Sequence, residues 1–461
     1  MSTLIKNGTI VSGSGCFPAD LLIEGEKIKA LYSPDRSQDL ADYQMEVVDA
    51  SGCYLFPGFI DAHTHFDLHV AGTVTADDFY TGSKAAIKGG TTTVLDFATQ
   101  YSGESLAEAL KNWHQKADDK SSCDYSFHMS VSEWNDDVEK EMDLMMEEGI
   151  TSFKLYLTYD IKVDDKTLYK ILKCLKRIHG IVGVHCENDG LIAALQEEAI
   201  AGRKTGVDNH FKTRPAEAEA EAIDRLLRIA KVVDVPVVIV HISTEAGYKV
   251  VEAARASGQT VFVETCPQYL LLDDSLYCGS EEQGRKYICA PPLRKTTDSK
   301  YLWKGIASSG IQTVCTDHCS FTTAQKALGK DDFRKIPGGL AGVETRGILM
   351  YTYGVDKGLI TLSDMCRILS ENQAKLYGLY PRKGLLAPGS DADIVVLRAN
   401  VSDTISADSQ LQNIDYAPFE GWKSTGRIET VYLRGTKVFD GGKLLKENHG
   451  QFVKRGTWQD L

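Results

Sequence analysis

Several features that would assign the chain to other protein classes are missing from its sequence. None of its apolar runs approaches the roughly 20 residues that a membrane-spanning helix requires. The first residues, M-S-T-L-I-K-N-G-T-I, lack the charged and apolar regions of a signal peptide and predict a short strand and a turn. We therefore expect a cytoplasmic protein that does not contact a membrane.

A basic patch with interleaved aromatic residues is also missing. The chain has 51 Lys and Arg against 64 Asp and Glu, and the resulting formal net charge of -13 would repel a phosphate backbone. Nucleic acid is thus excluded as the expected partner. A small, neutral or weakly charged substrate fits this charge better.

Cysteine pairs of the C-x-x-C type are absent as well. In a reducing cytosol the 11 scattered cysteines are expected to be buried thiols rather than disulfides. Cys315 and Cys319 flank the stretch T-D-H, but Asp317 between them is the better candidate metal ligand. The remaining composition, 43% hydrophobic and 25% charged over 461 residues, predicts a globular protein with one large and one smaller domain.

The segment F-P-G-F-I-D-A-H-T-H ends in two histidines, His63 and His65. Alternate side chains of a strand face the same way, so His63 and His65 would direct both imidazoles at one point. Neutral imidazole is a common ligand of zinc-like ions. Taken alone, the pair is a weak signal, and two polar residues at the end of a strand are the more common interpretation.

Apolar, strand-like runs alternate with helical patterns through the middle of the chain. The helical spacing is clearest at residues 105–116 and 216–231. Eight strands with crossovers predict a closed (β/α)₈ barrel, a TIM barrel, in which functional residues collect at the C-terminal ends of the strands. The predicted strands cover residues 58–63, 91–98, 125–130, 151–158, 181–187, 236–243, 260–265 and 311–317.

The two ends of the chain predict short strands separated by Gly and Asp turns. Neither end is long enough to bury a good core alone, so we expect them to join into one small β-sandwich beside the barrel. The predicted division assigns residues 1–55 and 376–440 to the sandwich and residues 56–375 to the catalytic barrel. Residues 441–461 form a C-terminal tail that could contact another subunit.

Polar residues stand at the predicted strand ends. Single histidines in such places are usually structural, but the joint pattern favours a metal centre in which one ligand bridges two ions. The six residues are His63, His65, Lys154, His185, His241 and Asp317.

Lys154 interrupts the apolar strand S-F-K-L-Y-L-T, where an unpaired ammonium would cost several kcal/mol. One interpretation is an ion pair with an acid such as Glu187. The other is a neutral amine that reacts with CO₂ to give a carbamate, whose two oxygens can bridge two cations. The residues alone leave both open.

Motifs along essentially the whole chain resemble those of the cyclic amidohydrolases, in the hydantoinase and dihydropyrimidinase branch. They include D-A-H-T-H, F-K-L-Y-L-T-Y, V-H-C-E-N, E-T-C-P-Q-Y-L, P-P-L-R, T-D-H-C and G-S-D-A-D. The stretch F-K-L-Y-L-T-Y is similar to that of bacterial D-hydantoinases and phenylhydantoinases. The resemblance implies a homotetramer, two Zn²⁺-like ions and an N-carboxylated Lys154 as their bridge.

The resemblance also implies a role for each residue. His63, His65 and Asp317 would hold one ion, His185 and His241 the other, and Lys154 both. Asp317 would also carry the proton, and the Tyr159 hydroxyl would stabilise the oxyanion. The backbones of Ala290 and Thr345 would bind the ring edge, while Phe66, Leu68 and His69 would line the substituent pocket.

Three other functions compete with hydantoin opening. A dihydroorotase typically carries an Arg directly after the H-x-H pair, where this chain has Phe66. An allantoinase shares the metal set and differs in pocket residues that the sequence does not place. A non-catalytic scaffold related to dihydropyrimidinases would have lost metal ligands, whereas all six are present here.

Overall fold

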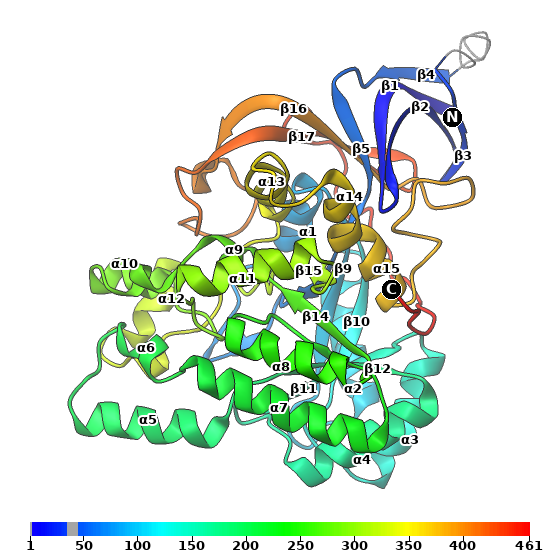
Figure 1. Ribbon diagram of the computed structural model, residues 1–461. Helices are drawn as coiled ribbons and strands as arrows, with labels where there is room; N and C mark the ends of the chain where they lie inside the picture. The colour runs from blue at the N-terminus through cyan, green and yellow to red at the C-terminus, as the bar shows by residue number, and fades with distance from the viewer. Residues whose placement is uncertain (1, 35–44) are drawn as a thin grey trace.

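The computed structural model describes residues 2–34 and 45–461. It has two parts, a barrel wrapped by helices and a sheet in which the two ends of the chain lie side by side (Figure 1). Residues 35–44, within the predicted segment 1–55, lie outside the described residues.

All eight predicted barrel strands are confirmed. They form one parallel sheet in the order β15-β14-β13-β12-β11-β10-β9-β6. A bridge between Thr64 and His318 brings the two edge segments together, because the N–H of His65 donates to the His318 carbonyl at 2.8 Å. The strands are β6 Phe59–Thr64, β9 Thr91–Thr99, β10 Asp124–Ser130, β11 Ser152–Tyr156, β12 Ile181–His185, β13 Val237–Ile239, β14 Val261–Thr265 and β15 Thr313–Val314.

Amphipathic helices cover the outside of the barrel. In α4 (Asp165–Ile178), the Asp164 carboxylate caps the first turn by accepting from the Thr167 N–H. The buried side chains recur at helical spacing at Leu168, Ile171, Leu172 and Leu175, and this face packs on the strands. Other covering helices are α1 Phe79–Lys88, α2 Leu106–Ala117, α3 Asp136–Glu147, α5 Asp189–Ala201, α7 Ala216–Val233, α8 Glu245–Ala256 and α11 Thr296–Ala307.

The chain ends join into one nine-stranded sheet, as predicted. Its order is β19-β18-β17-β16-β5-β1-β2-β3, with β4 beside β1. A separate hydrophobic core lies under it and includes Ile5, Leu21, Leu55, Ile394 and Tyr432 from both ends. The strands are β1 Ser2–Ser12, β2 Gly15–Glu24, β3 Lys27–Tyr32, β4 Met45–Asp49, β5 Cys53–Pro57, β16 Ile394–Thr404, β17 Lys423–Leu433, β18 Thr436–Asp440 and β19 Lys443–Leu444.

A buried ion-pair network joins this sheet to the barrel. Lys383 Nζ lies 2.8 Å from the carboxylate of Asp124, at the start of β10, and 2.6 Å from that of Asp393. Arg434 also pairs with Asp124. Asp124, Asp391 and Asp393 are close enough to hold a metal ion. Lys27 and Arg382 also pair with Asp391, at 2.6 and 2.9 Å, so cations already compensate all three carboxylates and we interpret this cluster as structural.

The C-terminal tail packs against the barrel of its own chain. Phe452 pairs with Tyr125 at the start of β10, and Trp458 contacts Phe262 on β14 at 5.9 Å between rings. The Arg455 side chain is buried and donates to Ser126 Oγ at 2.9 Å. The tail therefore covers the amino-terminal end of the barrel, while its predicted contact with another subunit stays a prediction.

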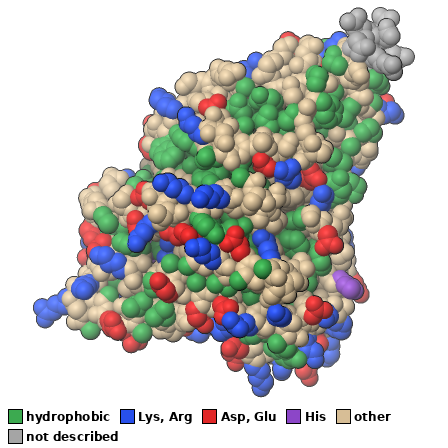
Figure 2. All heavy atoms as spheres, in the orientation of Figure 1, with side chains coloured by type: hydrophobic (Ala, Val, Ile, Leu, Met, Phe, Trp, Pro, Cys, Tyr) green, Lys and Arg blue, Asp and Glu red, His purple; other side chains and the backbone are tan. Residues whose placement is uncertain are grey.

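Within the described residues, no helix combines the length and the apolar character needed to traverse a lipid bilayer. On the face shown in Figure 2, Lys and Arg side chains are interspersed with Asp and Glu. Among the described residues seen on this face, charges of one sign form no large patch.

Candidate metal centre

The six residues predicted to bind metal meet at one end of the barrel. Each stands in a strand or within three residues after it, toward the carboxyl ends of β6, β11, β12, β13 and β15. Ring centroids lie 5.2 Å apart for His63 and His65, 5.3 Å for His63 and His241, and 4.6 Å for His185 and His241. The sequence thus placed these side chains in the correct neighbourhood.

Asp317 lies between the two histidines of β6. Its Oδ1 atom is 3.2 Å from His63 Nε2 and 3.1 Å from His65 Nε2. Burial alone would raise the pKa of Asp317, but His63 and His65 hold it well below its usual value. The carboxylate is therefore ionised and can accept a proton or bind a cation.

Buried carboxylates orient two of the imidazoles from behind. Glu264, at the end of β14, lies 2.6 Å from His63 Nδ1. Glu187 lies 2.8 Å from His185 Nε2 and also pairs with Arg214. Although burial would raise it, Arg214 and His185 lower the pKa of Glu187 to about 2. Such carboxylate–histidine pairs fix the nitrogen that faces a metal. Glu187 and Glu264 stand in the motifs V-H-C-E-N and E-T-C-P-Q-Y-L, but the sequence does not indicate which histidine each one contacts.

Lys154 points into the same space from β11. Its side chain is 1% exposed and its Nζ lies 3.5 Å from His63 Nε2. Burial lowers the pKa of Lys154 to about 8, against the opposing effect of Asp317 and Glu264. No carboxylate of the described residues forms an ion pair with Lys154. Glu187 forms its ion pair with Arg214 instead. The ion-pair interpretation with Glu187 is therefore wrong.

The donor set fits a divalent cation. One ligand atom each of His63, His241 and Asp317 lies within 4.8 Å of the others. Burial lowers the pKa of His65, His185 and His241, so these imidazoles are neutral, as metal binding requires. Neutral imidazoles beside a carboxylate are typical zinc ligands.

Three residues of the site adopt a left-handed backbone conformation. The φ angles are +73° at Tyr159, +38° at His241 and +52° at Asp317. This region is uncommon for non-glycine residues and often marks functional sites. Sequence patterns do not indicate it, because these residues lie in the irregular segments two or three residues after the ends of β11, β13 and β15.

Tyr159 lies at the rim of the cluster, and its role toward the oxyanion stays a prediction. Its ring is 5.1 Å from that of His185, and the Arg214 guanidinium lies 5.6 Å from the ring centroid. The side chain is 37% exposed, and partial burial raises the pKa of its hydroxyl. The hydroxyl is therefore protonated at neutral pH and can donate a hydrogen bond.

The backbone of Ala290 is free to bind a ligand. No group within the described residues hydrogen-bonds to its N–H or carbonyl, and the exposed Gly338 is free in the same way. The two segments are neighbours, since Gly339 donates to the Ile288 carbonyl at 2.9 Å. Gly338 was missed by sequence analysis, because its proximity to Ala290 is a tertiary contact between two loops.

Thr345 requires a correction. Its N–H donates to Gly342 and its carbonyl accepts from Leu349, both at 3.0 Å, at the start of α13 (Arg346–Leu349). The next residue, Arg346, donates to the Ile60 carbonyl near the beginning of β6. Thr345 thus lies toward the end of the barrel opposite His63, and its backbone groups are not available to a ring.

Phe66 requires a second correction. Its ring is fully buried against Phe79 of α1 at 5.5 Å and against His318 at 5.4 Å. The alternation that turns His63 and His65 inward sends Phe66 outward, so its side chain does not line the pocket. Leu68 is half-buried before a short hairpin, β7 (His69–Val70) and β8 (Thr73–Val74), and its pocket role stays a prediction.

Phe97 is a site neighbour that the sequence did not indicate. It stands in β9, with its ring stacked on His65 at 4.8 Å and 4.6 Å from His63. On its other side it stacks on His128 at 4.8 Å. Phe97 therefore forms an apolar support beneath the two histidines of β6.

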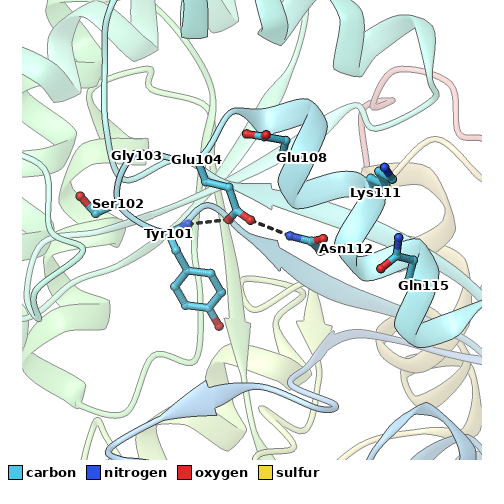
Figure 3. Close-up of a pocket in the computed structure, with 8 residues that line it drawn as sticks. All are labelled: Tyr101, Ser102, Gly103, Glu104, Glu108, Lys111, Asn112 and Gln115. Atoms are coloured by element: carbon cyan, nitrogen blue, oxygen red, sulfur yellow. Dashed lines mark hydrogen bonds between the residues drawn. The ribbon is translucent and has the colours of Figure 1, made fainter.

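A separate open hollow of about 490 Å³ lies between the loop after β9 and α2 (Figure 3). Glu104 accepts there from the Tyr101 N–H at 3.1 Å and from Asn112 Nδ2 at 2.6 Å. None of the predicted site residues lines it. We do not assign chemistry to this hollow.

Comparison with known proteins gives one consistent group. The amidohydrolase family model matches residues 54–438. The chain is 42% identical to a D-hydantoinase of Geobacillus stearothermophilus, covering 100% of this chain and 98% of that protein. It is also 42% identical to a D-phenylhydantoinase of Escherichia coli strain SE11, covering 99% and 98%. A dihydropyrimidinase structure from Brevibacillus agri NCHU1002 superposes with a TM-score of 0.97 at 41% identity, covering 100% of both chains.

Proposed function

The chain belongs to the amidohydrolase family, within its hydantoinase and dihydropyrimidinase branch, and from that premise we propose the reaction that it catalyses. The enzyme hydrolyses the ring amide of 5-substituted hydantoins, aryl hydantoins included, and of dihydropyrimidines, and releases N-carbamoyl amino acids. The observation that carries this proposal is the cluster of four imidazoles, Asp317 and the buried Lys154 at the barrel mouth.

We propose that this cluster holds two divalent ions, with Zn²⁺ favoured by the nitrogen and oxygen donors. His63, His65 and Asp317 would hold one ion and His185 and His241 the other. Lys154, carboxylated by CO₂, would contact both. Ions bound there supply Lewis-acid activation of water and of the ring carbonyl.

Side chains of the protein transfer the proton of the attacking water and stabilise the negative charge on the carbonyl oxygen. Asp317 is ionised and accepts the proton of the attacking water, then returns it to the ring nitrogen that departs. The protonated Tyr159 hydroxyl donates to the oxygen that gains negative charge. Glu264 and Glu187 keep the imidazoles oriented through the cycle.

The free backbone groups of Ala290 and Gly338 are suited to the planar N–C=O edge of the ring. Such an edge presents one donor and one acceptor, and an unpaired N–H and carbonyl match that pattern. This proposal retains the predicted contact of Ala290 and replaces Thr345 by Gly338.

The proposed reaction is tested by assaying a panel of cyclic amides on one purified sample. Dihydrouracil, hydantoin, phenylhydantoin, allantoin and dihydroorotate would be incubated with enzyme, and the products identified by mass spectrometry. We expect N-carbamoyl products from the hydantoins and from dihydrouracil. Preferred turnover of allantoin would instead identify an allantoinase, and absence of all turnover would identify a scaffold. The homotetramer and the cytoplasmic location stay predictions.

A further inference from the structure

A buried lysine outside the metal centre holds two backbone segments together. Lys326 ends the short helix α12 (Thr323–Lys326) and its side chain is 1% exposed. Its Nζ donates to the carbonyls of Ile288 at 2.7 Å, Pro337 at 2.8 Å and Gly339 at 2.8 Å. No carboxylate of the described residues forms an ion pair with it.

All three N–H donors of the Lys326 ammonium group are used in hydrogen bonds. Lys has three N–H donors and no acceptor, and here three carbonyls take one donor each. Burying a cation without a paired anion is unfavourable, so a lysine that only filled interior volume would be a poor choice at this position. An apolar side chain of similar length would fill the same volume but would leave these three carbonyls without that donor.

The two clamped segments have little regular structure of their own. Residues 288–290 and 337–339 lie outside helices and strands, and one direct backbone bond, from Gly339 to Ile288, joins them. A Cβ atom on Gly339 would lie 2.3 Å from the Cys319 carbonyl, so this segment also packs closely against the chain just after Asp317. Lys326 is therefore the main polar link that sets their separation.

The unpaired groups stand directly beside the clamped ones. Ala290 follows Ile288 by two residues, and Gly338 lies between the two carbonyls of Pro337 and Gly339 that Lys326 binds. Every displacement of these carbonyls would move the free N–H and C=O groups of Ala290 and Gly338. Their spacing decides whether one planar ring edge can reach both.

The neighbouring Gln325 extends this connection to a third loop. Its Nε2 donates to the Val74 carbonyl at 2.6 Å and to Thr73 Oγ1 at 3.0 Å, in the hairpin that follows His65. The helix α12 thus ties together the loops after β6, β14 and β15. Lys326 is its contact with the two segments that carry free backbone groups.

We propose that Lys326 is a positioning residue that sets the distance between the Ala290 and Gly338 backbones and thereby tunes recognition of the cyclic amide edge. The inference rests on the proposed function for the identity of the ring. It assigns Lys326 no part in proton transfer or metal binding.

The test compares Lys326→Met with Lys326→Gln and with the control Lys330→Met. Met keeps the length but removes all donors, and Gln keeps two. Lys330 is exposed and its side chain has no recorded partner among the described residues. Ring contacts act in both the ground and transition states, so their loss raises KM more than it lowers kcat. We expect KM for hydantoin to rise about 10- to 100-fold in Lys326→Met and less in Lys326→Gln, with unchanged metal content.

Hydrogen–deuterium exchange provides a readout independent of turnover. Peptides covering 286–293 and 336–342 should exchange faster in the Lys326 variants, while peptides covering 59–66 stay unchanged. If Lys326→Met does not fold, Lys326→Gln decides the question. Unchanged KM and unchanged exchange in a folded variant would overturn the inference. A wild-type enzyme that opens no cyclic amide would reject the proposed function, but the exchange comparison would still decide the clamp.

Discussion

The Nδ1 atom of His185 lies 2.9 Å from the Nε2 atom of His241. Because the ionised Glu187 accepts from His185 Nε2, the proton of that ring is on Nε2 and Nδ1 presents a lone pair to the barrel mouth. Burial keeps His241 neutral as well. Two imidazole nitrogens that converge in this way are suited to one cation, next to the site formed by His63, His65 and Asp317.

Metal analysis tests this arrangement. Elemental analysis of the purified enzyme should approach two divalent ions per chain, and His241→Ala should lower that content toward one. His114→Ala is the matched control, because His114 pairs with Asp118 away from the cluster. A metal-free sample that remains fully active would show that the centre is not catalytic.

Lys154→Ala should remove both activity and most of the bound metal, because the proposed bridge between the ions is lost. Short-chain carboxylic acids added to this variant should restore part of each by supplying a carboxylate in the space left. Lys162→Ala serves as control, since Lys162 forms a half-exposed ion pair with Asp189. Normal turnover in Lys154→Ala would contradict the carboxylated bridge.

Asp317→Asn should lower kcat by about 10²- to 10⁴-fold, the usual contribution of a general acid–base group. The amide keeps the shape and one oxygen near His63 and His65 but cannot accept the proton. The measurement pairs steady-state kinetics with metal content. An unchanged rate at unchanged metal content would reject Asp317 as proton carrier.

Strand periodicity explains how far the sequence alone could reach. It predicted the eight strands and placed His63, His65, His185, His241 and Asp317 together, because buried parallel strands are long apolar runs and their carboxyl ends meet. Side chains alternate along a strand, so a residue next to the inward-facing His65 is expected to face outward. The same rule therefore predicts the observed orientation of Phe66.

Loop geometry limited the rest of the prediction. The free Gly338 backbone, the opposite location of Thr345 and the Lys326 clamp depend on how segments after β14 and β15 fold back. The backbone bond from Gly339 to Ile288 and the Lys326 contacts with three carbonyls join segments that are not adjacent in sequence. The carbonyls in these contacts carry no residue-specific signal. The packing of Arg455 beneath the barrel is hidden for the same reason.

Arg455→Met should lower the free energy of unfolding by about 1–3 kcal/mol, the cost of leaving buried hydrogen-bonding groups unpaired. The guanidinium donates to Ser126 Oγ at 2.9 Å and to the Tyr377 carbonyl at 3.3 Å. Urea unfolding followed by circular dichroism measures the change. Lys454→Met is the neighbouring control, because Lys454 is exposed in its pair with Glu148. Equal stability of the two variants would show that the tail is not held by Arg455.

The last prediction concerns the choice between hydantoins and dihydroorotate. Because the Phe66 ring is buried away from the pocket, the argument against a carboxylate substrate rests on Arg214 instead. The Arg214 guanidinium lies 5.6 Å from the Tyr159 ring centroid, and its charge is already compensated by Glu187 at 2.5 Å. A substrate carboxylate next to Tyr159 would therefore be desolvated beside a cation that Glu187 already neutralises, at a cost of several kcal/mol. Since 1.4 kcal/mol is about a factor of ten, phenylhydantoin should be opened at least on the order of 10²-fold faster than dihydroorotate.

Dihydrouracil has the dihydroorotate ring without its carboxylate, so the ratio of the kcat/KM values of these two substrates, measured on one sample, isolates the effect of the carboxylate. Comparable turnover of dihydroorotate and phenylhydantoin would mean that the pocket contains a cation able to bind the carboxylate.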